Sequence, residues 1–178
     1  MCITVGTDIP DFPIETYVSG EDGPLETSLA GYRGRWLVLV FYPRDFTFVC
    51  PTELQAFAEL APDFEAEEAV IVAASTDSYW SHKAWFESHW MLREVCYPVV
   101  ADTGHRLGRA FGVLTADGSA LRATFVIDPA GVIRHASVTD QSVGRSPEET
   151  LRVLQALRTG ELCPVGWRPG RPTLSIAA

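Results

Sequence analysis

The chain has 178 residues, of which 47% are hydrophobic and 21% are charged, and its formal net charge is −9. This length fits one ordinary domain with a continuous core, and the composition is that of a packed globule rather than a disordered chain. The acidic balance disfavours a nucleic-acid partner or an anionic membrane surface, although one local basic pocket is compatible with it.

The sequence contains no apolar stretch near the roughly 20 residues that a membrane span needs. Its first residues, MCITVGTDIP, lack the charged and apolar regions of a secretion signal. We therefore expect a cytoplasmic protein that does not cross a membrane.

The first predicted elements alternate between strand and helix. Residues 35–42, RWLVLVFY, form a short apolar run that predicts a buried strand, and Pro43 ends it. Apolar residues at helical spacing follow from about Pro51. Residues 69–74 predict a second buried strand, and residues 79–89 predict a second helix.

The later elements add a hairpin and a last helix. Residues 97–100 and 123–127 predict strands, and a turn at 128–131 leads into a strand at 132–138. A Ser-Pro-Glu-Glu helix start at 146–149 predicts a helix that runs to about residue 158 and stops at a glycine.

This order of elements predicts an α/β fold with a central mixed sheet flanked by helices. We assign residues 1–160 to one domain and residues 161–178 to an irregular C-terminal arm, because the segment from Cys163 onward is rich in Pro and Gly. Trp167 is the residue through which this arm could dock. We expect no second domain.

The four cysteines are Cys2, Cys50, Cys96 and Cys163. No CxxC is present and no histidine lies close to any cysteine in the sequence, so zinc-finger and thioredoxin-type redox motifs are absent. We expect single thiols without a metal or another cofactor.

Cys50 directly precedes Pro51, a residue that suits the first position of a helix. Its sulfur should therefore lie near a helix N-terminus, where unpaired N–H groups favour a thiolate. A buried structural cysteine is the alternative, and the helix position alone does not decide between the two.

The segment around Cys50, FYPRDFTFVCPTEL, resembles the active-site segment of the peroxiredoxins. Pro43, Thr47 and Cys50 match the family's PxxxTxxC pattern, and the flanking residues resemble the alkyl hydroperoxide reductase C-subunit branch. Further blocks follow in the family's order over roughly residues 34–173, namely HKAW, RATFVIDP, SVGR and ELCPVGW.

The resemblance implies a thioredoxin-like fold and a thiol peroxidase of the typical 2-Cys type. Cys50 would attack hydrogen peroxide or an organic hydroperoxide and become a sulfenic acid. Cys163 of another subunit would then form a disulfide with it. A thioredoxin-like protein or a dedicated disulfide reductase would open that disulfide. The resemblance also implies a homodimer and a ring of dimers, such as a decamer.

Thiolate formation alone explains little of such a reaction. A thiol with a pKa of about 8.5 is several per cent ionised near neutrality, so full ionisation gains little more than about tenfold. Enzymes commonly lower barriers by about 8 kcal/mol or more. Alignment of the peroxide and stabilisation of the departing oxygen should supply most of this.

The resemblance assigns these tasks to the Thr47 hydroxyl, the Arg122 guanidinium and the Cys50 backbone N–H, with Pro43 shielding the thiolate. Glu53 would hold Arg122 or a second arginine, or would only complement the helix dipole. Trp85 would line the dimer surface or the rim of the site, or would be an ordinary core aromatic.

Some features depart from the family or leave alternatives open. The chain lacks a clear GGLG segment and a Tyr-Phe helix after Trp167, so we expect slow inactivation by excess peroxide. We interpret Cys2 and Cys96 as packing or incidental residues. A redox sensor or holdase chaperone is the alternative class; a disulfide reductase would normally use a CxxC. The electron donor, preferred peroxide and ring size remain open.

Overall fold

The computed structural model describes residues 4–174 and contains a seven-stranded sheet in the order β2-β1-β5-β4-β3-β6-β7. The strands are β1 (Pro13–Tyr17), β2 (Leu25–Ser28), β3 (Trp36–Phe41), β4 (Ala69–Ser75), β5 (Val99–Ala101), β6 (Arg122–Ile127) and β7 (Ile133–Thr139). The β3–β4 and β4–β5 pairs are parallel and the remaining pairs are antiparallel, which confirms the predicted mixed sheet.

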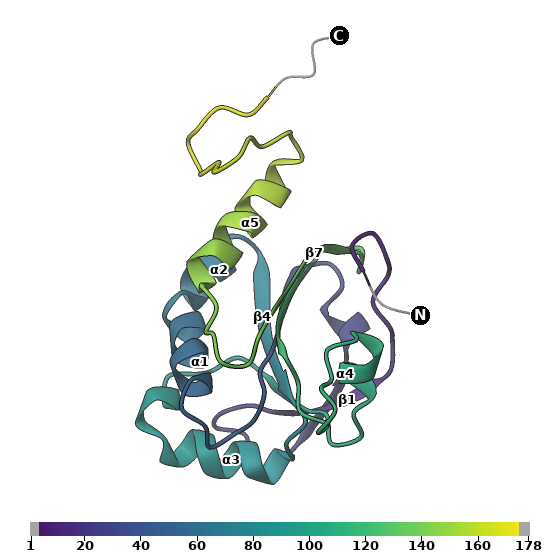
Figure 1. Cartoon of the computed structure of the whole chain (residues 1–178), viewed down its shortest axis with the longest axis vertical. Helices are drawn as coiled ribbons and strands as arrows, with labels where there is room; N and C mark the ends of the chain where they lie inside the picture. Colours follow the sequence, from purple (N-terminus) through teal and green to yellow (C-terminus); the bar gives the residue numbers. More distant parts are fainter. Residues whose placement is uncertain (1–3, 175–178) are drawn as a thin grey trace.

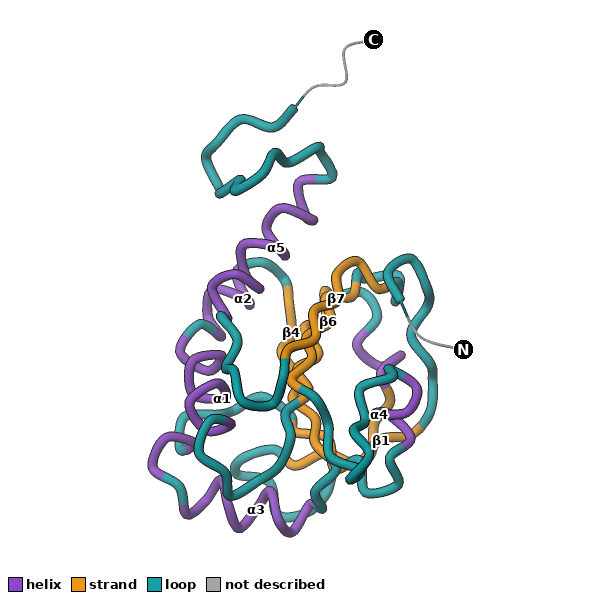
Figure 2. The backbone as a smooth tube through the Cα atoms, in the orientation of Figure 1, coloured by secondary structure: helices purple, strands orange, loops and turns teal. Residues whose placement is uncertain are grey.

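Helices cover both faces of this sheet (Figures 1 and 2). One face packs against α1 (Cys50–Glu59), α2 (Ala61–Ala66), α3 (Tyr79–Ser88), the short turn η2 (Trp90–Leu92) and α5 (Pro147–Thr159). The other face packs against η1 (Leu29–Tyr32) and α4 (Arg106–Ala110).

The central strand β3 shows why the core has two halves. Side chains alternate across a strand, so Val38 and Val40 pack with the helices of the first face. Leu37, Leu39 and Phe41 pack on the other face. A strand that is buried on both faces has apolar residues at nearly every position, so its sequence is a continuous apolar run that predicts the strand.

The helix predicted from about Pro51 is shorter than its apolar pattern indicates. It ends at Glu59, and α2 begins at Ala61. Pro62 explains the break, because a proline has no N–H to donate and its ring clashes with the carbonyl four residues earlier. Strands β1 and β2 and helix α4 were not predicted. Strand β5 begins at Val99, two residues after the predicted start at residue 97.

The predicted ends of α5 are confirmed. The Ser146 hydroxyl accepts a hydrogen bond from the Glu149 N–H at 3.1 Å. Gly160 follows the helix with a φ of 67°, a left-handed conformation that glycine adopts without strain.

The described part of the C-terminal segment, residues 161–174, lies beyond α5, at the end of the molecule away from the start of α1 (Figure 1). We call it the arm. Trp167 is buried, and its indole N–H donates to the Arg171 carbonyl at 3.0 Å. Arg152 of α5 donates to the Trp167 carbonyl at 2.9 Å. Leu162 and Leu174 form an isolated β-bridge, so these contacts fold the arm onto itself and onto α5.

Within residues 4–174, none of the helices is both long enough and apolar enough to span a bilayer.

Candidate active site

Cys50 is the first residue of α1, and its side chain is fully buried. It lies on the wall of a pocket of about 290 Å³. The residues that line this pocket are Pro43, Arg44, Thr47, Phe48, Val49, Cys50, Asp117, Ser119, Arg122 and Gln141. Pro51 follows Cys50 in the first turn and has no N–H, and the Thr52 N–H donates to the Val49 carbonyl at 3.1 Å.

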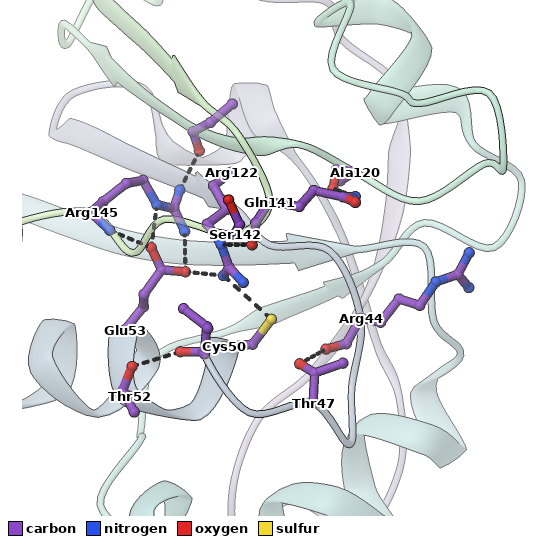
Figure 3. Close-up of polar contacts among 12 residues, drawn as sticks. Arg44, Thr47, Cys50, Thr52, Glu53, Ala120, Arg122, Gln141, Ser142 and Arg145 are labelled. Carbon is purple, nitrogen blue, oxygen red and sulfur yellow. Dashed lines mark hydrogen bonds and ion pairs between the residues drawn. The ribbon is translucent and has the colours of Figure 1, made fainter.

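Arg122 contacts the sulfur directly. Its Nη1 atom donates to Cys50 Sγ at 3.4 Å, and its side chain is buried (Figure 3). The sheet register brings the two residues together, because Ala123 of β6 pairs with Phe41 at the end of β3. The contact places a cationic group directly beside the thiol.

Glu53 holds two arginines in place (Figure 3). It lies three residues after Cys50 on α1, so both side chains share one face of the helix. Its carboxylate accepts from Arg122 Nη1, and it accepts from the Arg145 backbone N–H and Nε, both at 2.8 Å. Burial raises the pKa of Glu53, but the hydrogen bonds from Arg145 and the charges of both arginines outweigh it, and the pKa lies below its ordinary value.

Arg145 was not assigned a role from the sequence, although it lies in the SVGR block. Its Nη1 atom donates to the Ala123 carbonyl at 2.7 Å and to the Thr124 hydroxyl at 3.2 Å. The guanidinium therefore ties α1, through Glu53, to strand β6. Sequence reasoning anticipated a second arginine near Glu53 without naming it.

Thr47 and Pro43 lie in the loop between β3 and α1. Both line the pocket, and Pro43 is buried. The Thr47 hydroxyl donates to the Arg44 carbonyl at 2.9 Å. Because its hydrogen is engaged by that carbonyl, the hydroxyl oxygen remains able to accept a hydrogen bond from a ligand in the pocket.

A buried polar cluster fixes the loop at residues 43–49, which carries Pro43 and Thr47 and which we call the motif loop. The sequence did not predict this cluster. The Asp45 carboxylate accepts from the Tyr42 hydroxyl at 2.7 Å and from the Ser81 hydroxyl at 2.8 Å. It also lies 2.8 Å from His82 Nδ1. Burial, followed by the Asp45 charge, raises the pKa of Tyr42 well above its ordinary value, so this hydroxyl remains a donor.

Trp85 does not line the pocket, which corrects the expectation that it forms the rim of the site. It is 1% exposed and packs in the core beside Tyr42. Its ring also lies 5.9 Å from the ring of Phe46, so it backs the motif loop from inside. Trp85 is therefore an ordinary core aromatic in this chain.

Cys163 belongs to a different cavity, a groove of about 850 Å³ between α5, the arm and the turn before β7. Its sulfur lies 3.6 Å from the Ala156 carbonyl and 3.4 Å from the Thr159 hydroxyl. This groove shares no lining residue with the Cys50 pocket. Cys96 is exposed, and Cys2 lies outside the described residues.

None of the four histidines, all within residues 4–174, hydrogen-bonds to Cys50. His82, the buried one near the motif, faces Asp45 and the Val100 carbonyl instead. In the same residues, no group of three His, Cys, Asp or Glu side chains could hold a metal ion. The arrangement therefore resembles an arginine-assisted thiol more than a Cys–His pair.

Comparison with known proteins gives consistent matches. Residues 5–136 match the model of the AhpC/TSA family. The chain is 46% identical to peroxiredoxin prdx-2 of Caenorhabditis elegans, over 96% of this chain and 88% of that protein. It is 40% identical to alkyl hydroperoxide reductase C of Mycobacterium tuberculosis, over 97% and 93%. The structure matches reduced 2-Cys peroxiredoxin of Plasmodium vivax with a TM-score of 0.90 and 30% identity, over 95% and 91%.

Proposed function

Because the chain belongs to the AhpC/TSA family and is a thiol-dependent peroxidase of the 2-Cys peroxiredoxin type with a thioredoxin-like fold, we propose that Cys50 is the residue that reduces the peroxide. The observation that carries this proposal is the buried Cys50 sulfur at the start of α1, with Arg122 Nη1 at 3.4 Å. A position at a helix start and a neighbouring guanidinium are both typical of the surroundings of reactive cysteines.

In the first step, the Cys50 thiolate attacks one oxygen of the peroxide bond. The O–O bond breaks, an S–O bond forms, and the departing oxygen leaves with the electron pair. That oxygen takes up a proton to become water, or an alcohol when the substrate is an organic hydroperoxide. Cys50 is oxidised to a sulfenic acid, and the peroxide is reduced.

Arg122 and Thr47 are suited to align the peroxide for this step. Within the described residues, Arg122 Nη2 has no hydrogen-bond partner, so its hydrogens are available to the pocket. The Thr47 oxygen can accept from the peroxide O–H, as its own hydrogen is held by the Arg44 carbonyl. Donors fixed in place before the reaction stabilise charge on the departing oxygen without reorganisation. Pro43 forms part of the pocket wall and limits the access of water to the Cys50 sulfur.

Glu53 is a positioning residue for Arg122. An isolated buried guanidinium is costly, and the Glu53 carboxylate offsets that cost while fixing its orientation. Arg145 donates to both oxygens of the same carboxylate, through Nε at 2.8 Å and through Nη2 at 3.1 Å.

Cys163 of a second copy is the proposed resolving residue. It condenses with the Cys50 sulfenic acid to form a disulfide, and water leaves. A disulfide requires Cα atoms within about 7 Å, whereas the arm lies beyond α5, at the end of the molecule away from the start of α1 (Figure 1). The Cys50 sulfur is also buried in a helical turn, so the first turn of α1 must open before the two sulfurs meet.

The partners follow from this cycle. A protein with two thiols, either thioredoxin-like or a dedicated disulfide reductase, returns the disulfide to two thiols. The assembly is a homodimer that forms a ring of dimers. A cytoplasmic location fits the cycle, because reducing compartments keep cysteines such as Cys50, Cys96 and Cys163 as thiols.

The test of this function is peroxide consumption by two matched cysteine variants. Cys50→Ser should abolish consumption, because an alcohol supplies no comparable anion near neutral pH. Cys96→Ser, which removes an exposed thiol, should retain most of the activity. Stopped-flow measurement with a panel of thiol reductants gives both rates. Comparable losses in the two variants would contradict a single reacting cysteine.

A further inference from the structure

A chain of hydrogen bonds runs along the wall of the Cys50 pocket. Four of its residues, Arg44, Asp117, Ser119 and Gln141, line the pocket, and we call them the polar rim. Arg44 Nη2 lies 3.2 Å from the Asp117 carboxylate and 3.4 Å from the Asp117 carbonyl. The Ser119 hydroxyl donates to Asp117 at 2.7 Å, and the Gln141 side-chain amide donates to the Ser119 hydroxyl at 2.9 Å.

Both ends of the polar rim reach the groups that face the peroxide. Arg122 Nε donates to the Gln141 carbonyl at 2.8 Å. At the other end, the Thr47 hydroxyl donates to the Arg44 carbonyl at 2.9 Å. The polar rim therefore connects Arg122 to Thr47. The order of its residues from Arg122 is Gln141, Ser119, Asp117 and Arg44. In Figure 3, Gln141 lies above the Cys50 sulfur and Arg44 lies to its right.

The Arg44–Asp117 ion pair is the outermost contact of the polar rim. Asp117 is held as a carboxylate, because hydrogen bonds from Ser119 and Thr115, together with Arg44, lower its pKa. The two side chains are 47% and 65% exposed, so the pair lies at the entrance rather than in the core. Phe48, which also lines the pocket, is 95% exposed, so the entrance has an apolar and an ionic side.

We propose that the polar rim makes this chain select small, polar hydroperoxides over bulky apolar ones, with the Arg44–Asp117 ion pair as the specificity-determining contact. The inference rests on the proposed function, because it concerns access to Cys50. Hydrogen peroxide donates and accepts hydrogen bonds and can replace water at the rim. A bulky apolar group can contact Phe48, but it must also displace or desolvate the ion pair on the other side of the entrance, and both are unfavourable.

The experiment compares the rate constants for the first oxidation of Cys50 by hydrogen peroxide and by cumene hydroperoxide. Arg44→Ala removes the cation. Asp117→Asn keeps an oxygen for Thr115 and Ser119 and replaces the oxygen that faces Arg44. Each change should raise the ratio of the cumene hydroperoxide rate to the hydrogen peroxide rate about three- to fivefold, the size expected for loss of an exposed ion pair. The double variant should give no further increase, because both changes remove the same contact.

Lys83→Ala is the matched control, because Lys83 forms an exposed ion pair with Glu87 on α3, and neither residue lines the pocket. Its ratio should equal that of the original chain. An unchanged ratio in both Arg44→Ala and Asp117→Asn, or additive effects in the double variant, would overturn the inference. If neither peroxide oxidised Cys50 in the original chain, the proposed function itself would fail, so the two failures are distinguishable.

Discussion

Glu53 is the residue on which the charge balance of the pocket depends. It is the carboxylate that meets both buried guanidiniums, those of Arg122 and Arg145. Removing one partner of a buried ionic group leaves the others uncompensated, which commonly costs about 3–5 kcal/mol. Its effect should therefore appear both in stability and in the rate with peroxide.

Glu53→Gln should lower the free energy of unfolding at neutral pH by about 3 kcal/mol. The Glu53 pKa is lower in the folded chain than its ordinary value of 4.5. Its stabilising effect is therefore complete above that ordinary value and is lost as the pH falls through the lowered pKa. The difference between the original chain and the variant should narrow in this acidic range. Urea unfolding over a pH series measures it.

Glu59→Gln is the control for this prediction, because Glu59 is an exposed residue on the same helix and, among residues 4–174, its side chain hydrogen-bonds to Gln55 alone. We expect a change near zero at every pH. A Glu53→Gln difference that stays constant into strong acid would show that the carboxylate charge is not what stabilises the fold.

The sequence predicts individual residues well where local chain order determines their position. Cys50, Thr47 and Pro43 lie within one short segment, so a motif is enough to place them. The polar rim joins Arg44 to Gln141, which lies 97 residues later (141 − 44). Only the folded sheet brings such residues together, so no local pattern could have predicted this contact.

At the level of elements, the arm is held by few contacts. Trp167 is its buried side chain, and Arg152 is the residue of α5 that bonds to the Trp167 carbonyl. The arm carries Cys163, which in the proposed cycle approaches the Cys50 pocket of a second copy. A weak attachment to its own α5 is compatible with that movement.

Trp167→Ala should release the arm without affecting the first reaction with peroxide. Loss of a buried tryptophan side chain costs about 3–5 kcal/mol, and the few contacts of the arm cannot offset that loss. Hydrogen–deuterium exchange should become much faster in residues 161–174, while the rate of Cys50 oxidation stays the same. Trp90→Ala is the control, because Trp90 is 64% exposed. Faster exchange throughout α5 would instead indicate that Trp167 stabilises the whole helix.

The elements were predicted where burial or capping leaves a clear pattern. Strands β3 and β4 are apolar on both faces, and α5 has a serine cap at its start and a glycine after its end. Strand β2 is a short edge strand of four residues with exposed or half-buried side chains, so it carries no apolar signal. Helix α4 has five residues, too few for helical periodicity.

At the scale of the whole molecule, the two proposed reacting sulfurs occupy separate cavities. Cys50 lines the pocket at the start of α1, and Cys163 lines the groove beside α5. This separation supports the proposal that a second copy of the chain supplies Cys163.

One equivalent of peroxide should convert the protein to a covalent dimer of about twice the 19.5 kDa chain. A non-reducing gel detects this dimer, and peptide mapping should find a Cys50–Cys163 linkage. Cys163→Ser should stay monomeric on the gel and accumulate a trappable sulfenic acid at Cys50. A dimer that survives Cys163→Ser, or an internal Cys50–Cys96 bridge, would contradict the assignment of Cys163.

The position of the arm also has a consequence for inheritance. If each arm serves the pocket of a neighbouring copy, a substitution in the arm leaves its own Cys50 fully competent and impairs the neighbour's. In a cell that expresses two alleles, the defect would then appear in subunits that do not carry it. Selection on the arm would act through the assembly, whereas selection on the pocket would act on the single chain.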